Sequence, residues 1–270
     1  MAYLKMMRPW EGYTKPFRIF GNLYFVGTIV ASTHVIDTGS GIILIDPGVP
    51  HALYLVLENI RALNLNPYDI KYIVISHGHY DHLGAAKALS ELTGAKIFLG
   101  RADREYANGT YDLTCAKEIG CPYYESFEPD VLLDEGDIIA LGNTSILCKK
   151  APGHTPGTMA FFFDVTDGEN TYRAAMHGGV GTNTMRKAFL QKYGLTTELR
   201  EAFVPAIKRL MNEKVDIHLG NHVENNDTIE KGERITEDYN PFIDSTAWKK
   251  FLQAMIEKYE RRMREEEEVQ

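Results

Sequence analysis

The stretch Ser76–Gly84 reads SHGHYDHLG and places three histidines and one aspartate within six consecutive positions. Imidazole nitrogens and carboxylate oxygens are common ligands of zinc in proteins. The stretch follows YIVIS (72–76), an apolar and β-branched run that is typical of a buried strand. It leads into HLGAAKALSELTG (82–94), whose apolar spacing predicts a helix that ends at Gly94. The sequence therefore predicts a loop of metal ligands between a strand and a helix.

The four donors in this loop are too many for one catalytic ion. A catalytic zinc typically takes three protein ligands and keeps a fourth position for water. His77 and His79 are two residues apart at the end of an extended strand and can face the same side. Asp81 and His82 follow the turn, where the chain has changed direction, and point to a neighbouring position. The spacing therefore predicts two ions, each of which needs a further ligand from elsewhere.

Two histidines later in the chain can supply these ligands. His154 in APGHTPGT and His222 in LGNHVEN each come just after a strand-like run, where loops project from the edge of a sheet. The six donors then divide into three and three. His218 is an alternative to His222 if the strand ends earlier, but its place in the apolar run VDIHLG favours the core or a position behind a ligand. His34 and His51 have no ligand-type neighbours and are interpreted as ordinary polar residues.

The rest of the sequence predicts strands and helices in two successive groups. Strands are expected within 17–39, 41–48, 72–76, 130–153, 158–165, 172–179 and 215–222, and helices over 50–63, 82–94, 198–212 and 245–265. Strands followed by helices, twice over, favour two sheets with helices on the outside. The final helix carries an apolar stripe from Trp248 to Met263, which indicates docking on the body. We expect a single domain over 1–270, with the helix 245–265 docked on it.

Composition restricts the class of protein. The chain has 270 residues, 44% of them hydrophobic, and a formal net charge of −8, which is typical of a soluble globular protein without a nucleic-acid partner. No stretch approaches the length of a membrane span, and the opening residues 1–17 lack the apolar run of a signal peptide. We expect a cytoplasmic protein that acts on a small-molecule substrate without a membrane partner, although a signal removed beforehand would leave no trace. The sequence does not specify an oligomeric state.

The three cysteines do not indicate a metal site or a disulfide framework. Cys115, Cys121 and Cys148 are odd in number and lack C-x-x-C spacing. Free Cys is among the most buried residue types and behaves as a small hydrophobic side chain. We therefore expect three buried thiols.

The motif SHGHYDHLG resembles the H-x-H-x-D-H signature of the metallo-β-lactamase superfamily. Five further stretches are similar, in the same order, to landmarks of the third subclass of metallo-β-lactamases: PFRIFGNLYFVGT, GIILIDPG, LDEGDIIALG, APGHTPGT and NPFIDSTAWKKFLQAM. The resemblance implies an α/β (α+β) fold, an αββα sandwich of two mixed sheets with outer helices, and a site for two Zn²⁺ ions at one edge. It also implies how the ligands divide: His77, His79 and His154 on the first ion, and Asp81, His82 and His222 on the second.

The implied site would catalyse hydrolysis. Two zinc ions about 3.5–4 Å apart can share a water molecule and lower its pKa from 15.7 towards about 7, which supplies hydroxide at neutral pH. Asp81 would orient that hydroxide and accept its proton, while the second ion would stabilise the anion that leaves a cleaved amide, ester or thioester. Ser76 lacks a base and an orienting residue at useful spacing, so a serine nucleophile is not indicated. The resemblance implies a β-lactam or a similar cyclic amide or ester as substrate.

Two further residues are expected close to the zinc pair. Asp46 in LIDPG resembles an aspartate behind the metal site of the family, and we expect it to orient a ligand. Hydrolases of the glyoxalase II type carry Gly-Asp, with the aspartate bridging the metals, and many third-subclass enzymes carry Ala-Asp-Ser, whereas this chain reads AMHGGVG. His177 or Gly178 thus replaces the bridging carboxylate and the serine. We expect His177 beside the ions, as a ligand or as a hydrogen-bond donor to Asp81 or substrate; a strand-end histidine bonded to backbone is the alternative.

Other functions remain open at this point. The closest alternative is a thioesterase or lactonase of the same superfamily that does not usefully hydrolyse β-lactams. The di-iron oxygen-reducing branch typically has a glutamate where this chain has His79, and carries a flavin domain, so it is not favoured. A non-catalytic, metal-stabilised binding module would need its open coordination positions blocked. The residues that hold the substrate are expected in 106–130, a Tyr-rich segment to which the sequence gives no clear structure, and in 179–197, and the sequence does not single them out.

Overall fold

The computed structural model describes residues 8–121 and 124–268. Within these residues the strands form one sheet of seven and one of five. The first sheet contains, in spatial order, β1 (Phe17–Phe20), β2 (Leu23–Phe25), β3 (His34–Asp37), β4 (Ile42–Ile45), β5 (Ile70–Ile75), β6 (Lys96–Gly100) and β7 (Val131–Leu133). The second contains β12 (Ile217–Leu219), β11 (Thr171–His177), β10 (Met159–Thr166), β9 (Thr144–Lys150) and β8 (Ile138–Leu141).

Both sheets are mixed, as predicted. In the first sheet β1 to β4 pair antiparallel, and β4 to β7 pair parallel. In the second sheet β8 to β11 pair antiparallel, and β12 joins β11 in parallel. All four residues of β4 are buried, which is typical of a parallel strand covered on both faces. The tight turn between β1 and β2 uses Gly21 at a positive φ of 51°, a conformation that suits glycine.

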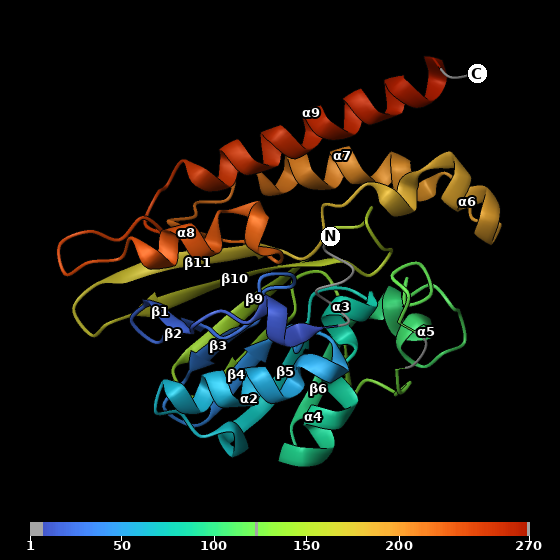
Figure 1. Ribbon diagram of the computed structural model, residues 1–270. Helices are drawn as coiled ribbons and strands as arrows, with labels where there is room; N and C mark the ends of the chain where they lie inside the picture. The colour runs from blue at the N-terminus through green and yellow to red at the C-terminus, as the bar shows by residue number, and fades with distance from the viewer. Residues whose placement is uncertain (1–7, 122–123, 269–270) are drawn as a thin grey trace.

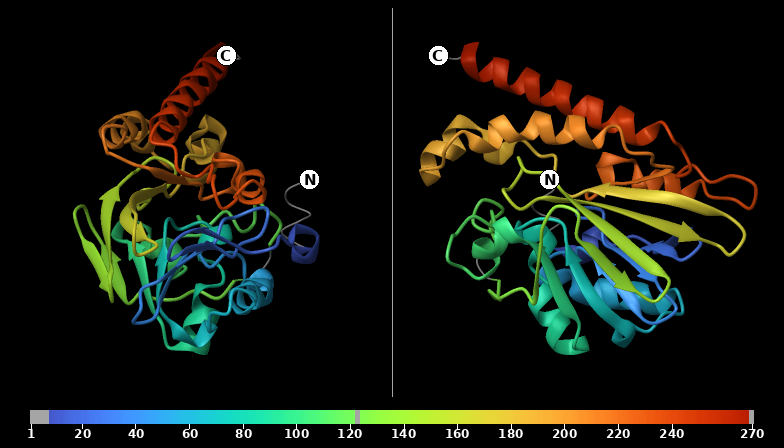
Figure 2. Two further views of the ribbon diagram at one scale, coloured as in Figure 1. Left: turned by 90° about the vertical axis from the view of Figure 1, so that its left-hand side faces the viewer. Right: turned by 180° about the vertical axis from the view of Figure 1, so that it is seen from behind.

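Helices lie on the outer face of each sheet (Figures 1 and 2). The α-helices are α2 (Leu53–Ala62), α3 (Tyr80–Leu83), α4 (Ala86–Thr93), α5 (Arg104–Ala107), α6 (Lys187–Tyr193), α7 (Glu198–Leu210), α8 (Thr228–Glu233) and α9 (Ala247–Glu268). Short 3₁₀ helices are η1 (Pro9–Gly12), η2 (Pro50–Ala52), η3 (Pro67–Asp69), η4 (Arg101–Asp103), η5 (Asn183–Met185) and η6 (Val223–Asn225). The left view of Figure 2 shows the order of the layers, helix, sheet, sheet and helix. The predicted αββα sandwich is therefore confirmed.

The hydrophobic core follows these layers. Residues such as Phe25, Ile43 and Phe161 fill the space between the two sheets. A second group packs α2 and α4 on the outer face of the first sheet, and a third packs α7 and α9 on the second sheet. Alternate residues of β10 serve two of these groups, since Phe161 belongs to the first and Phe162 to the third. This alternation fixes the register of the strand and hence the position of the loops at its ends.

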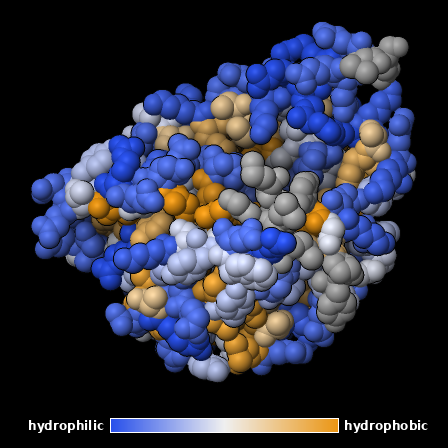
Figure 3. Space-filling model, viewed as in Figure 1, coloured by the Kyte–Doolittle hydropathy of each residue, from blue (hydrophilic) through white to orange (hydrophobic). Residues whose placement is uncertain are grey.

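The first part of the long helix α9 packs on the second sheet, and the helix also packs on α7. It begins two residues after, and ends three residues beyond, the predicted 245–265. Trp248 is 1% exposed, meets the ring of Phe162 edge-on at 5.6 Å, and donates its indole N–H to the carbonyl of Leu210 at 2.9 Å. Figure 3 shows mostly hydrophilic residues on the outward side of α9. The far end of the helix is held by Glu266, which accepts from Arg200 at 2.6 Å.

The predicted helix 82–94 is instead two helices, α3 and α4. The last helical bond of α3 runs from the amide of Gly84 to the carbonyl of Tyr80, whereas the amide of Ala85 donates to the carbonyl of Gly48, outside the helix, at 2.9 Å. The separate helix α3 carries Asp81 and His82, while α4 packs on the outer face of the first sheet. The end of the helix was predicted correctly: Gly94 adopts the left-handed conformation at φ 73°.

Two expectations from composition can be compared with the structure. The three cysteines all lie within the described residues, are buried and form no disulfide there, as predicted. Among residues 8–121 and 124–268, no helix is both long and apolar enough to span a membrane. Residues 1–7, the first part of the opening segment that was interpreted as lacking a signal peptide, lie outside the described residues.

Candidate metal centre

The six predicted ligands meet at one edge of the sandwich, although they are far apart in sequence. His77 and His79 follow β5, and Asp81 and His82 belong to α3 immediately after them. His154 lies in the loop between β9 and β10, and His222 follows β12. The six residues form two groups of three, and these groups are the ones that the family resemblance implied.

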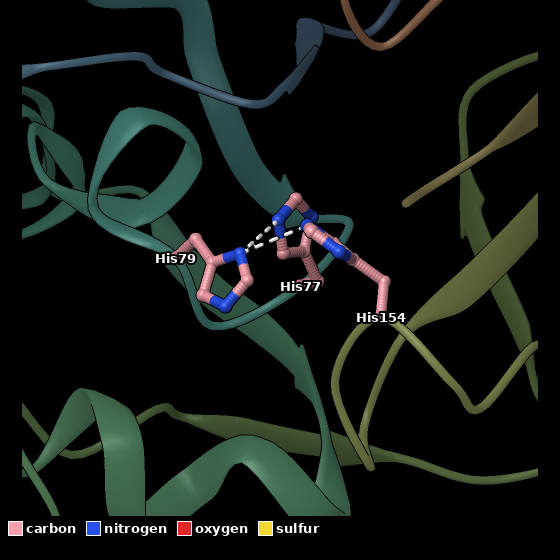
Figure 4. A group of neighbouring side chains, drawn as sticks. All are labelled: His77, His79 and His154. Carbon is pink, nitrogen blue, oxygen red and sulfur yellow. Dashed lines mark hydrogen bonds between the residues drawn. The ribbon is translucent and has the colours of Figure 1, made fainter. Parts of the chain in front are cut away.

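The first set consists of His77, His79 and His154, all of them buried, with one ring nitrogen of each within 4.8 Å of the others. Nδ1 of His79 lies 3.1 Å from Nε2 of His77 and 2.9 Å from Nε2 of His154. Figure 4 shows the three rings converging from two loops, with His79 facing the other two. Three nitrogens around one point form half of the predicted centre.

The second set consists of Asp81, His82 and His222, whose ligand atoms also lie within 4.8 Å of one another. The Nε2 atoms of His82 and His222 are 3.1 Å apart. Oδ2 of Asp81 lies 3.6 Å from the first of these nitrogens and 3.5 Å from the second. The side chains of Asp81 and His222 are 15% and 24% exposed, so this set meets solvent at both residues.

The outer nitrogens of the second set are held by hydrogen bonds, which fixes what the inner nitrogens can do. Nδ1 of His82 bonds to a carboxylate oxygen of Asp46 at 2.8 Å, and Nδ1 of His222 bonds to the carbonyl of Val30 at 3.1 Å. Both acceptors lack a proton to give, so each Nδ1 carries the hydrogen. When the two rings are neutral, each therefore directs an Nε2 lone pair toward the other ring.

The first set follows the same rule. Nδ1 of His154 donates to the carbonyl of Gly181 at 2.7 Å, and Nδ1 of His77 bonds to Oγ of Ser76 at 3.1 Å. The Ser76 hydroxyl itself donates to Asp46 at 2.7 Å, so it accepts from His77. The Nε2 atoms of His77 and His154 thus direct lone pairs toward His79. The other ring nitrogen of His79, Nε2, has no hydrogen-bond partner among the described residues.

Facing lone pairs about 3 Å apart repel one another unless a cation or a proton lies between them. The Nε2 atoms of His82 and His222 face each other in this way when both rings are neutral, and in the first set the Nε2 atoms of His77 and His154 both point at Nδ1 of His79. Zinc prefers three or four such ligands, and histidines that bind zinc typically donate their other ring nitrogen to a carboxylate or carbonyl. The residues of both sets therefore fit the binding of zinc.

Burial favours the neutral, metal-binding form of the histidines in the first set. It lowers the pKa of His77 and of His79 well below the usual value, with the charges of nearby histidines as the next cause. Burial also lowers the pKa of His154 to about 4. Metal ions bind the neutral form of imidazole, so these rings need not lose a proton at neutral pH.

Opposite charges dominate the second set. Burial acts to raise the pKa of Asp81, but the charges of His82, His222 and His79 outweigh it and bring the value to about 2. Burial acts to lower the pKa of His82, but Asp81 and Asp46 together outweigh it and raise the value. The carboxylate of Asp81 is therefore ionised at neutral pH, as a ligand or proton acceptor must be.

Comparison with known proteins identifies the family. The model of the metallo-β-lactamase superfamily matches residues 26–167, which is more than half of the chain. The chain belongs to the metallo-β-lactamase superfamily. The match ends before β11 and does not include His222, so the site combines residues inside and outside the matched range.

Solved structures of this superfamily extend the similarity over almost the whole chain. The native FEZ-1 metallo-β-lactamase from Legionella gormanii is 27% identical, with a TM-score of 0.86 over 95% of this chain and 98% of that one. A class B3 di-zinc metallo-β-lactamase, LRA-12, from an Alaskan soil metagenome is 26% identical, with a TM-score of 0.80 over 93% and 95%. The expected similarity to the third subclass is thus confirmed.

Curated relatives match a shorter part. Hydroxyacylglutathione hydrolase GloC from Haemophilus influenzae is 30% identical over 139 residues, which cover 51% of this chain and 63% of the relative. The chain spans less than two thirds of the length of the first curated relatives that it matches.

The departure from the superfamily pattern occurs at the end of β11. A Cβ on Gly178 would lie 2.3 Å from the carbonyl oxygen of Met159, so a side chain does not fit there. His177 is buried, and its pairing with Ala160 places it on the side of the sheet that faces α7 and α9. Its Nδ1 accepts from the amide of Gly179 at 3.3 Å, and its Nε2 has no partner among the described residues. The described contacts include no hydrogen bond between His177 and Asp81.

The role of His177 thus stays a prediction. Gly179, which it holds, packs against the ring of His154, since a Cβ there would lie 2.5 Å from Cδ2 of that ring. We expect His177→Ala to lower turnover or metal affinity by about 10–100-fold, as losses behind metal ligands typically do. His218→Ala, which removes a buried imidazole on the neighbouring strand, is the control and should leave both unchanged. Wild-type kinetics of His177→Ala at limiting zinc would show that this histidine is a bystander.

The segments expected to hold substrate flank the centre. The carbonyl of Thr114 accepts from the amide of Tyr80 at 2.8 Å, which ties the first segment to the ligand loop. Glu118 then joins it to α6, because its carboxylate accepts from Lys192 at 2.6 Å and also from the Tyr193 hydroxyl. Residues 122–123 of the segment 106–130 lie outside the described residues. The assignment of substrate contacts to these two segments stays a prediction.

Sequence reasoning missed two buried residues that support the ligand loops. Asn221 donates its side-chain amide to the carbonyl of Gly178 at 2.7 Å, beside His222. Asp103 accepts hydrogen bonds from two of the ligand loops at once. The only signal for Asn221 was its place before His222, and Asp103 lies in no motif. His218, the alternative to His222, packs instead against Trp248 and Phe251 under α9.

Proposed function

We propose that the protein is a di-zinc hydrolase that cleaves an amide or ester bond in a small molecule of the β-lactam kind. The observation that carries the proposal is the pair of adjacent ligand sets, in each of which three ligand atoms lie within 4.8 Å of one another. His77, His79 and His154 would hold the first ion, and Asp81, His82 and His222 the second. When bound, two zinc ions activate water at neutral pH and stabilise the negative charge that develops in the leaving group.

The chain's own residues support this chemistry without a protein nucleophile. Asp81 is ionised and partly exposed, so it can accept a hydrogen bond, and then a proton, from a water molecule that attacks the substrate. Ser76 is fully buried and donates to Asp46, which leaves its hydroxyl unable to reach a substrate. Asp46 instead orients His82, so that the ring nitrogen on the ion's side is the unprotonated one.

A thioesterase or lactonase is the second candidate. The relative named hydroxyacylglutathione hydrolase favours it, because that protein is 30% identical to this chain. The β-lactamase structures cover far more of the chain, including β12 and α9, at 26% and 27% identity. Neither a bridging carboxylate nor a serine follows β11 here, so the substrate would be held by other residues in 106–130 and 179–197.

We expect protein purified without chelator to contain close to two transition-metal ions per chain, mainly zinc. Neutral imidazole nitrogens with one carboxylate suit zinc. Metal analysis of one sample, combined with assays on a chromogenic cephalosporin, an acylglutathione thioester and a lactone, tests the metal content and the substrate together. Chelator should abolish hydrolysis, and added zinc should restore it. Full activity with one tightly held ion would contradict the two-ion proposal, and loaded protein that hydrolyses none of the three would favour a binding module.

A further inference from the structure

Asp103 is a buried carboxylate that the sequence did not single out. It ends η4, the short 3₁₀ helix after β6, and its side chain is fully buried. The carboxylate accepts three hydrogen bonds: from the amides of Gly78 and Gly157, each at 2.7 Å, and from the hydroxyl of Thr155 at 2.5 Å. All three donors are neutral. A buried carboxylate with only neutral donors is costly unless each bond is well made, so such a residue needs an explanation.

The three donors belong to the two loops that carry the first ligand set. Gly78 lies between His77 and His79, whereas Thr155 directly follows His154. One carboxylate, delivered by a third segment, therefore bonds to both loops next to their ligands. We propose that Asp103 is a positioning residue, which holds these loops at the separation where the three ring nitrogens converge on one ion. The inference rests on the proposed function and extends it to a residue outside every recognised motif.

Close packing of the backbone supports this assignment. A Cβ on Gly157 would lie 2.5 Å from the amide nitrogen and 2.6 Å from Cγ of Asp103. A Cβ on Gly78 would lie 3.1 Å from Cβ of Asp103 and 3.0 Å from Cβ of Tyr106. Glycine at both positions thus lets each amide reach the carboxylate directly. The contact also fixes β6, since a Cβ on Gly100 would lie 2.0 Å from the carbonyl oxygen of Gly157.

Asp103→Asn is the variant that tests the role. The amide keeps the size of the side chain, but its NH₂ group faces an N–H donor where the carboxylate had an acceptor. We expect the affinity of the first set for metal to fall by about 10–100-fold, and the affinity of the second set to stay within about threefold. Apo protein is titrated with Co²⁺ and Zn²⁺ against a competing chelator, and the visible spectrum of Co²⁺ distinguishes three nitrogens from two nitrogens and a carboxylate.

Two further variants separate positioning from general stability. Thr155→Val removes one of the three bonds and leaves the carboxylate, so it should weaken the first set by only a few-fold, and it serves if Asp103→Asn does not fold. Asp216→Asn is the control, because Asp216 also accepts from a backbone amide, that of Arg173 at 2.9 Å, away from both sets. It should leave both affinities unchanged. Thermal unfolding of each metal-free variant measures stability independently of metal.

The outcomes distinguish failure of this inference from failure of the proposed function. Equal affinity of the first set in wild type and Asp103→Asn overturns the role of Asp103, even if both ions bind. Equal weakening of both sets, in proportion to lost thermal stability, overturns it as well, because that is the result of a purely structural role. Wild-type protein that binds no ion at all contradicts the metal centre itself.

Discussion

Asp81→Asn is expected to lower turnover by about 10²–10⁴-fold, the usual contribution of a group that transfers a proton in the transition state. Asparagine has the same size but carries no charge and cannot accept a proton at neutral pH. The wild-type carboxylate is ionised and lies 3.6 and 3.5 Å from the inner nitrogens of His82 and His222. Steady-state hydrolysis of the best substrate of the panel measures the loss.

Metal content must be measured on the same sample, because Asp81 is also a proposed ligand. The expected result is a loss of turnover that persists when excess zinc has filled both sets. Asp164→Asn is the matched control: it removes one negative charge from an exposed position that pairs with Arg173, and should leave turnover unchanged. Near wild-type turnover of Asp81→Asn with two ions bound would exclude the proposed role as proton acceptor.

Trp248→Ala is expected to destabilise the folded protein by about 3–5 kcal/mol, the usual cost of truncating a buried aromatic residue to alanine. The side chain is 1% exposed and contacts Phe162 of the second sheet. The substitution would also leave the carbonyl of Leu210 without the indole N–H that it now accepts. Denaturant unfolding in saturating zinc measures the change in free energy at a fixed contribution from metal binding.

The matched control is Trp10→Ala. Trp10 is 61% exposed, and substitutions at such positions usually change stability by about 0.5 kcal/mol or less. A Trp248→Ala variant that unfolds at the same denaturant concentration as Trp10→Ala would show that α9 contributes little to the stability of the sheets. Turnover of the Trp248 variant at low temperature should stay close to that of wild type, because the residue lies on the opposite side of the second sheet from the space between the sheets.

The fold could be predicted where local patterns and tertiary packing agree. The apolar run at 72–76 corresponds to β5, which spans Ile70–Ile75, and the stripe that starts at Trp248 corresponds to α9. The predicted helix at 82–94 failed in its first part, because the hydrogen bond from the amide of Ala85 to the carbonyl of Gly48 is a tertiary contact that no spacing of apolar residues reports. The described residues of the segment 106–130 form the end of α5 and irregular loops before β7, and such loops lack periodicity.

In the candidate site, too, some residues could be predicted from the sequence and others could not. The gathering of the six proposed ligands was predictable because their residue types are restricted by metal chemistry and four of them are closely spaced within one loop. Asp103 was not, since an aspartate that accepts from backbone amides looks like any surface aspartate in sequence. His177 was placed beside the ions by its position after a strand, but the sequence could not give the side of the sheet that it faces. One residue of strand register decides that side.

The order of the ligands along the chain has a consequence for protein synthesis. The first set is complete once His154 has been made, whereas the second set waits for His222, which lies 68 residues later. At a translation rate of about 5–20 residues per second, this interval lasts roughly 3–14 s. A growing chain therefore passes through a stage in which all three histidines of one set exist while the other set lacks a member. A metal ion that binds the chain during this stage can find only one set with all three of its proposed ligands.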